Sequence, residues 1–276
     1  GNNNGEPDSV IDSLKGINVL DDVTITADIK CDCLLVGTGV KLTVADGIKF
    51  EVTNLLQLDG DIRLNGNAQL IQTFSGVKNE AGNGNLTIDK TSATTNVYQS
   101  GYWTAPATTD GSTFTIAGVM KDGTSSTPQD INFTDSSILD GDGTTSPITV
   151  SGRWLARISN SQAWDVPLSP TEIFTPGEAY NMKSTGGADG SSTQNYSFVG
   201  QPNAGDYSLD IDDDSFYLIG NPYPSALDAD QFISENTNAI GGTLYFYESG
   251  SEMSHFSSDY TGGYATYNGI TGVPFG

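Results

Sequence analysis

The sequence has few of the residues on which familiar enzyme chemistry depends. Among its 276 residues are one histidine and two cysteines, so catalytic triads, histidine-rich zinc sites and scaffolds of several disulfides lack their components. Only 11 basic residues oppose 34 acidic ones, which gives a net charge of -23 that repels nucleic-acid phosphates and anionic lipid surfaces. No apolar run approaches the roughly 20 residues that cross a bilayer. We therefore expect neither an enzyme, nor nucleic-acid binding, nor membrane insertion.

The residues that are abundant belong to turns. Apolar residues, counted without Gly, make up 36% of the chain, against roughly 45% with Gly included in an ordinary globular protein, and Gly, Thr, Ser, Asn and Asp fill the difference. This composition is typical of an extracellular β protein. The chain starts at Gly1 without a signal-peptide pattern, so we expect a processed or excised chain that is secreted or lies on the outer cell surface.

Short apolar alternations fill residues 17–74, after a polar leader at 1–16. Breaks such as Asp46-Gly47 and Asn65-Gly66 make successive strands begin about six to eight residues apart. A meander of tight hairpins has this spacing, and so does a parallel β-solenoid with coils of roughly 20 residues. The near-absence of polar loops favours the β-solenoid, or β-helix. We therefore predict a solenoid, with its connector, over residues 17–96.

Longer, aromatic-rich segments with longer loops follow in residues 97–276. They predict an antiparallel β-sandwich, so the expected fold class is all-β. One short helix is expected at 228–233, with the Ser225 hydroxyl as its N-cap. The prolines of Asn221-Pro222-Tyr223-Pro224 should fix a rigid structural loop at the entry of that helix.

The two cysteines, Cys31 and Cys33, are two residues apart on a predicted strand. A disulfide between them would be strained, so we expect two reduced thiols that both face into the first coil. A metal site that combines them with His255 is the weaker alternative, because two distant segments would have to meet.

The segment FYLIGNPYPSALDADQFI (216–233), followed by GTLYFYE (242–248) and GGYATYN (262–268), resembles a module of large secreted and cell-surface proteins of the Bacteroidota. Those proteins are similar to type IX secretion cargo and gliding-type adhesins. The resemblance implies export by the type IX machinery and a place in a longer cell-surface protein. One departure is Tyr247, which stands where the resemblance leads us to expect tryptophan.

Two triplets in the leader, Asp8-Ser9-Val10 and Asp12-Ser13-Leu14, resemble the acceptor for O-glycosylation in exported Bacteroidota proteins. They make Ser9 and Ser13 candidate glycosylation sites, and an exposed linker tolerates a bulky glycan.

Calcium is the cofactor that the acidic surplus could support, because it takes six to eight oxygen ligands in flexible geometry. Two loops are candidates: Asp140 with Asp142, and the denser run of Asp210, Asp212, Asp213 and Asp214. The alternative is that these carboxylates cap turns or lie on a solvated hairpin tip.

Tyrosines near the C-terminus could form a platform for sugar rings. The candidates for carbohydrate binding are Tyr245, Tyr247, Tyr260, Tyr264 and Tyr267. Alternation places Tyr245 and Tyr247 on one face of a strand. Packing in an aromatic core or at its rim is the competing interpretation.

From the sequence we expect a non-catalytic, exported structural or adhesive module of a larger cell-surface protein. The alternative is a carbohydrate-binding module of a secreted polysaccharide-degrading enzyme. Its expected partner is a surface polysaccharide or another cell-surface protein. The isolated chain should be monomeric, because its charge opposes self-association.

Overall fold

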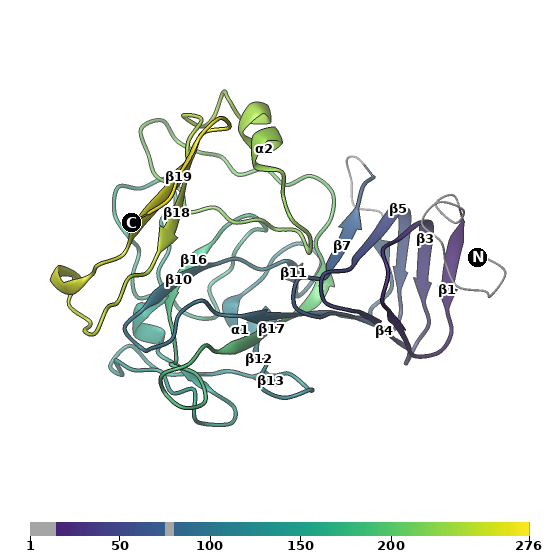
Figure 1. Cartoon of the computed structure of the whole chain (residues 1–276), viewed down its shortest axis with the longest axis horizontal. Helices are drawn as coiled ribbons and strands as arrows, with labels where there is room; N and C mark the ends of the chain where they lie inside the picture. The colour runs from purple at the N-terminus through teal and green to yellow at the C-terminus, as the bar shows by residue number, and fades with distance from the viewer. Residues whose placement is uncertain (1–14, 75–79, 276) are drawn as a thin grey trace.

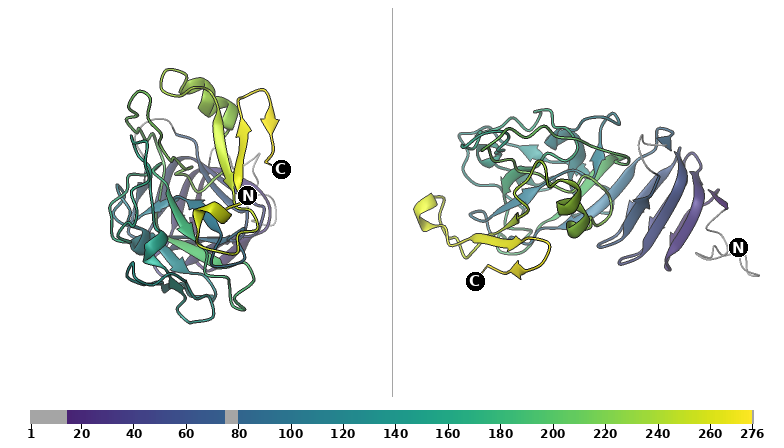
Figure 2. Two further views of the ribbon diagram at one scale, coloured as in Figure 1. Left: turned by 90° about the vertical axis from the view of Figure 1, so that its left-hand side faces the viewer. Right: turned by 90° about the horizontal axis from the view of Figure 1, so that it is seen from above.

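The computed structural model describes residues 15–74 and 80–275. Strands account for most of its regular structure, which confirms the all-β class. None of the helices in this part of the chain is long and apolar enough to span a membrane. The N-terminal strands form a stack of coils at one end of an elongated molecule, and the C-terminal hairpin lies toward the other end (Figures 1 and 2).

The N-terminal strands pair in parallel and build a β-solenoid. One sheet has the order β1-β3-β5-β7, with β8 also paired to β5, and a second sheet contains β2-β4-β6-β9. The strands are β1 (Gly16–Val19), β2 (Val23–Ile25), β3 (Ile29–Val36), β4 (Lys41–Val44), β5 (Lys49–Leu58), β6 (Asp61–Leu64), β7 (Gln69–Gln72), β8 (Glu80–Ala81) and β9 (Leu86–Thr91).

The register of these strands sets the length of a coil. Phe50 pairs with Leu70 and Leu42 with Ile62, each twenty residues further along the chain. The paired residues are buried and form ladders of apolar side chains inside the stack. This parallel pairing confirms the predicted solenoid and excludes the hairpin meander.

Aspartates at the corners join each coil to the next. The carboxylates of Asp22, Asp28, Asp46 and Asp61 accept hydrogen bonds from backbone N–H groups of the following coil, at Lys41, Lys49, Asn67 and Asn85, over 2.8, 2.9, 2.7 and 3.1 Å. Each bond satisfies a backbone donor that a corner would leave unpaired. Part of the acidic surplus therefore stabilises the solenoid itself.

The prediction that both cysteines face inward is wrong for Cys33. Cys31 is buried and burial raises its pKa to about 12, but Cys33 is half-buried and its Sγ donates to the carboxylate of Asp32. The pairing of β3 with β5 shifts register between the two cysteines, so the inward positions change from Cys31 to Leu34. Both thiols are free, as expected.

The remainder of the described chain, residues 97–275, is called the head. Most of its strands pair antiparallel, as predicted. They are β10 (Ser100–Trp103), β11 (Ala107–Thr108), β12 (Met120–Asp122), β13 (Gln129–Asp130), β14 (Asn132–Phe133), β15 (Thr149–Val150), β16 (Tyr180–Lys183), β17 (Asn195–Pro202), β18 (Leu244–Glu248), β19 (Gly263–Tyr267) and β20 (Gly272–Val273).

The head also contains short helices. The expected helix is α2 (Ala229–Glu235), but its N-cap is Asp228, whose carboxylate accepts from the N–H groups of Asp230 and Gln231, and not Ser225. An additional helix, α1 (Ile116–Val119), begins after Thr115, whose hydroxyl accepts from the N–H of Gly118. Two 3₁₀ turns lie at Gly152–Trp154 and Ser257–Asp259.

The solenoid and the head share one sheet. Strand β17 of the head pairs antiparallel with β9, the last solenoid strand, and the order continues as β9-β17-β12-β13. Arg63 on β6 holds both carboxylate oxygens of Asp89 on β9, at 2.8 and 3.0 Å, and Asp89 also accepts from Ser197 on β17 at 2.7 Å. The sheet therefore runs across the boundary expected at residue 97, and the head covers this end of the solenoid.

We expect Gly60→Ala to lower the free energy of unfolding by about 1–3 kcal/mol, because its Cβ would overlap the carbonyl oxygens of Gly37 and Val40. Urea unfolding followed by circular dichroism measures the change. Gly37→Ala is the control, since its Cβ would lie 3.4 Å from the nearest atom, the carbonyl oxygen of Val19. Equal effects of the two substitutions would contradict this close approach of the coils.

Candidate functional site

The C-terminal sheet presents tyrosines on one face. Its order is β18-β19-β20, and the antiparallel register sets Tyr247 opposite Tyr264 and Tyr245 opposite Thr266. Directly opposed residues share a face of a sheet, so Tyr245, Tyr247 and Tyr264 lie together. Tyr267 is three residues from Tyr264 and lies on the other face, opposite Leu244.

Two residues from elsewhere in the head extend this row of rings. Tyr102 on β10 stacks on Tyr247, with ring centroids 5.1 Å apart, and Trp164 lies 5.7 Å from Tyr102. The remaining steps are Tyr247 to Tyr264 at 5.5 Å and Tyr264 to Tyr245 at 6.4 Å. We call Trp164, Tyr102, Tyr247, Tyr264 and Tyr245 the aromatic strip.

The strip is fixed at its middle and open toward solvent along its length. The hydroxyls of Tyr102 and Tyr264 are 2.9 Å apart and hydrogen-bonded. Burial raises the pKa of Tyr102 and, less strongly, that of Tyr247, so both phenols stay neutral and can donate as well as accept. Trp164, Tyr264 and Tyr245 are 40%, 48% and 65% exposed. These rings can contact a ligand without being moved.

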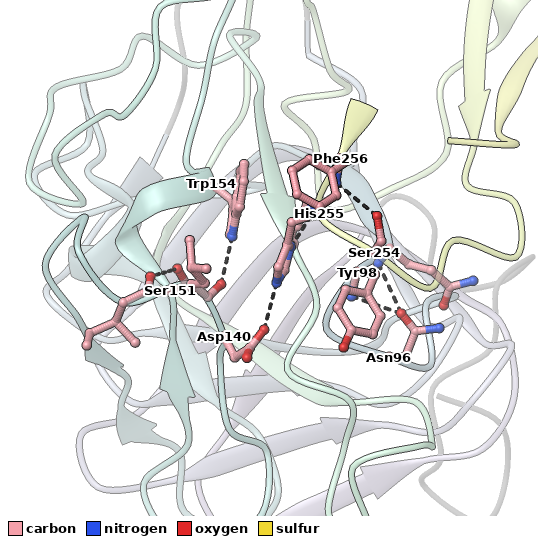
Figure 3. A network of polar contacts seen from close by, with 12 residues as sticks. Asn96, Tyr98, Asp140, Ser151, Trp154, Ser254, His255 and Phe256 are labelled. Atoms are coloured by element: carbon pink, nitrogen blue, oxygen red, sulfur yellow. Dashed lines mark hydrogen bonds and ion pairs between the residues drawn. The ribbon is translucent and has the colours of Figure 1, made fainter. Parts of the chain in front are cut away.

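Beside the strip, the only histidine of the chain lies in a polar network (Figure 3). His255 Nε2 is 2.7 Å from the carboxylate of Asp140, and its Nδ1 is 3.0 Å from the ammonium of Lys183 on β16. The ring also stacks on Trp154, with centroids 4.9 Å apart. We call Asp140, Trp154, Lys183 and His255 the histidine cluster. An ammonium can only donate, so Nδ1 accepts and the hydrogen on Nε2 is donated to Asp140.

Aromatic rings surround the lysine of this cluster. Lys183 Nζ lies 4.3 Å above the ring centroid of Trp154 and 4.9 Å from that of Tyr260. Lys183 is 4% exposed, and burial lowers its pKa to about 8, although the charges of Glu252 and Asp140 oppose that shift. Because the amine is covered on these sides, it is not an open nucleophile. The bonds of His255 to Asp140 and Lys183 join separate segments of the head.

The segment that the cluster holds is the connection between β18 and β19, residues 249–262. Its backbone also bonds to the rest of the head through Gln99, whose side chain donates to the carbonyl of Gly250 at 2.6 Å. Inside it, the carboxylate of Glu252 accepts from the N–H groups of Gly250 and Gly262. Burial raises the pKa of Glu252, but these hydrogen bonds outweigh it and the pKa lies below its usual value.

A cavity of about 450 Å³ opens beside the histidine cluster. Its lining includes the apolar or aromatic residues Tyr98, Leu139, Trp154, Met253 and Phe256, together with Arg153, Ser254 and His255. Met253 and Phe256 are 73% and 74% exposed, so the cavity has an apolar rim in contact with solvent.

The structure distributes the predicted tyrosines over three places. Tyr245, Tyr247 and Tyr264 are in the strip, Tyr260 covers Lys183, and the hydroxyl of Tyr267 donates to Asp230. Sequence reasoning missed Tyr102 and Trp164, which lie far from the others in the chain. Their aromatic character was the only signal that could have identified them.

The predicted calcium ligands belong to two separate surface loops. Asp140 contacts His255, and Asp142 accepts from the N–H and hydroxyl of Thr144. Asp210, Asp212, Asp213 and Asp214 are exposed, in a tip that Asn160 ties through the backbone of Asp210 and Asp212. Across residues 15–74 and 80–275, no three acidic, histidine or cysteine side chains converge as metal ligands. Calcium binding remains a prediction.

Two further predictions concern other residues. Cys31 and Cys33 lie on β3 in the solenoid, while His255 is bound to Asp140 and Lys183 in the head, so the three do not form a metal site. The candidate glycosylation residues Ser9 and Ser13 lie outside the described residues.

A family model described as a domain of unknown function (DUF8693) matches residues 6–272. The chain therefore belongs to this family. No curated protein and no solved structure matches the chain.

We expect His255→Ala to destabilise the head by about 1–3 kcal/mol, because it removes the bonds to Asp140 and Lys183 and the stacking on Trp154. Limited proteolysis should cut residues 249–262 faster in this variant, and thermal unfolding should report the lost stability. Phe256→Ala is the control in the same segment, since Phe256 is 74% exposed. Unchanged proteolysis of the histidine variant would show that the cluster does not hold the segment.

If calcium binds at the 210–214 tip, it should raise the Tm of the wild-type protein and raise that of Asp212→Asn less. Thermal unfolding with calcium and with a chelator measures both shifts. Asp189→Asn serves as the control, because that exposed aspartate caps the separate turn at Ser191. Identical wild-type melting in the two conditions would remove calcium from consideration.

Proposed function

We propose that this member of the DUF8693 family is a non-catalytic adhesive module of an exported bacterial surface protein, and that its aromatic strip binds a saccharide chain. The observation that carries the proposal is the strip itself, a row of five rings from four segments with its two ends exposed. Flat aromatic faces bind the apolar faces of sugar rings, and phenol hydroxyls bond to sugar hydroxyls.

The relation of the solenoid to the head supports an adhesive role. The C-terminal hairpin that carries three of the strip tyrosines lies toward one end of the molecule, and β1 of the solenoid lies at the other (Figure 1). The shared sheet joins the two parts through backbone hydrogen bonds rather than a linker. Such a connection suits a stalk that presents a binding surface in a fixed orientation.

The proposed export and surface location rest on the sequence resemblance to Bacteroidota surface proteins. Type IX export is part of the same proposal.

The second candidate function is a carbohydrate-binding module of a secreted polysaccharide-degrading enzyme. The exposure of Tyr245 and Tyr264 supports it equally, because a module that only spaces other domains does not need exposed rings in a row. The two functions share the strip and differ in what is attached to the chain.

A glycan array followed by calorimetry tests the proposal. We expect selective binding of at least one saccharide class, and Tyr245→Ala should weaken it by about threefold to tenfold through the lost ring contact. Phe246→Ala is the matched control, because Phe246 is the next residue of β18, is 52% exposed and lies on the opposite face. Absence of binding to every saccharide would leave a purely structural module. Equal loss in both variants would place binding away from the strip.

A further inference from the structure

A second cavity, of about 400 Å³, lies where the solenoid meets the head. We call it the junction cavity. Asn67, Gln69 and Lys90 line it from the solenoid side, and Tyr102, Trp103 and Tyr223 from the head. Its volume is within the range of about 300–1,000 Å³ that is usual for ligand sites. Tyr102 belongs both to this lining and to the aromatic strip, so the strip and the cavity adjoin.

Hydrogen bonds anchor the head wall of the junction cavity. The carbonyl of Pro224 accepts from the N–H of Leu70 on β7 at 2.9 Å, and the N–H of Ala226 donates to the Gln69 side chain at 3.0 Å. The Tyr223 hydroxyl donates to the carbonyl of Gly205 at 2.8 Å. The proline loop is therefore bonded to the edge of the solenoid, and the cavity does not have to form when a ligand arrives.

The polar groups of the cavity suit hydroxyl groups. The side-chain amide of Asn67 has no hydrogen-bond partner in the described part of the chain. Gln69, which lines the cavity, uses its carbonyl oxygen for Ala226, and this leaves its amide hydrogens as donors. Lys90 bonds a backbone carbonyl, that of Gly66, at 3.3 Å, and an ammonium has further donors.

Charge distinguishes this cavity from the rest of the molecule. Within residues 15–74 and 80–275, no carboxylate is among the residues that line it, although the chain has 34 acidic residues. Aromatic faces and hydrogen-bond donors fit a polyhydroxylated ligand. The absence of carboxylates from this lining disfavours a cation, and the net charge of -23 disfavours an anion, so a neutral ligand fits best.

We infer that the saccharide-binding surface continues from the strip through Tyr102 into the junction cavity, where Asn67 and Gln69 on the solenoid hold the end of a neutral saccharide chain. This inference rests on the proposed function. It makes the solenoid part of the binding site. The two amides then help to determine which saccharide is bound and how long it must be.

Calorimetry on the full chain tests the inference, with cellohexaose, xylohexaose, mannohexaose and chitohexaose as probes and the corresponding disaccharides beside them. Asn67→Ala removes the unpaired amide. Gln69→Glu keeps an oxygen for the N–H of Ala226 but removes the donor. Asn85→Ala is the matched control, because Asn85, like Asn67, is an exposed corner residue whose N–H bonds to an aspartate of the preceding coil.

We expect both cavity variants to weaken binding of the hexasaccharide that the wild-type protein selects by about fivefold to tenfold. Binding of the disaccharide, and of either ligand to Asn85→Ala, should not change. Hexasaccharide binding that both cavity variants retain in full would overturn the inference and leave the proposed function standing. If the wild-type protein binds a saccharide on the array but none of the four hexasaccharides, the inference is overturned and the proposed function stands. Absence of binding to every saccharide overturns both.

Discussion

The pairing of β9 with β17 is the interaction on which the rest of the structure depends. A parallel solenoid ends in strands whose backbone N–H and C=O groups have no partner, and such edges promote aggregation unless another segment covers them. Here β17 covers the edge of β9 over the six residue pairs from Asn195 to Gly200. Pro224 covers part of the edge of β7, at Leu70. The same contacts that terminate the solenoid therefore position the head, the proline loop and the junction between them.

The acidic composition is explained in large part by backbone chemistry. Corner aspartates accept N–H bonds from the next coil, and Asp110, Asp135 and Asp189 accept them within turns of the head. These bonds, together with bonds from serine and threonine hydroxyls, lower the pKa values of Asp110 and Asp189, and the Ser137 side chain followed by its N–H lowers that of Asp135. The carboxylates therefore stay charged under ordinary conditions. A high count of acidic residues therefore says little about metal binding in this chain, because turns and corners use many of them.

The solenoid could be predicted from the sequence because its signals are local. Alternating aliphatic residues and glycine-containing corners repeat within each coil, and the twenty-residue spacing follows from them. The change in which residues of β3 point inward after Cys31 could not be predicted, since it arises from the register between β3 and β5. The strip was found in part: Tyr245 and Tyr247 share a strand, but Tyr102 reaches them only through a contact between segments more than 140 residues apart. The histidine cluster likewise joins Asp140, Lys183 and His255, which no local pattern connects.

The fixed junction determines how a force on the head would be transmitted. A ligand that pulls on Tyr245 or Tyr264 loads β18 and β19, which contact β10 through the stacked ring of Tyr102. β10 pairs with β16, and the histidine cluster ties β16 to the connection between β18 and β19. The head can pass such a load to the solenoid through β17 and β9, whose hydrogen bonds run side by side along the strands. The Arg63, Asp89 and Ser197 contacts cross the same boundary, so separating the head from the solenoid requires backbone and side-chain bonds to break together.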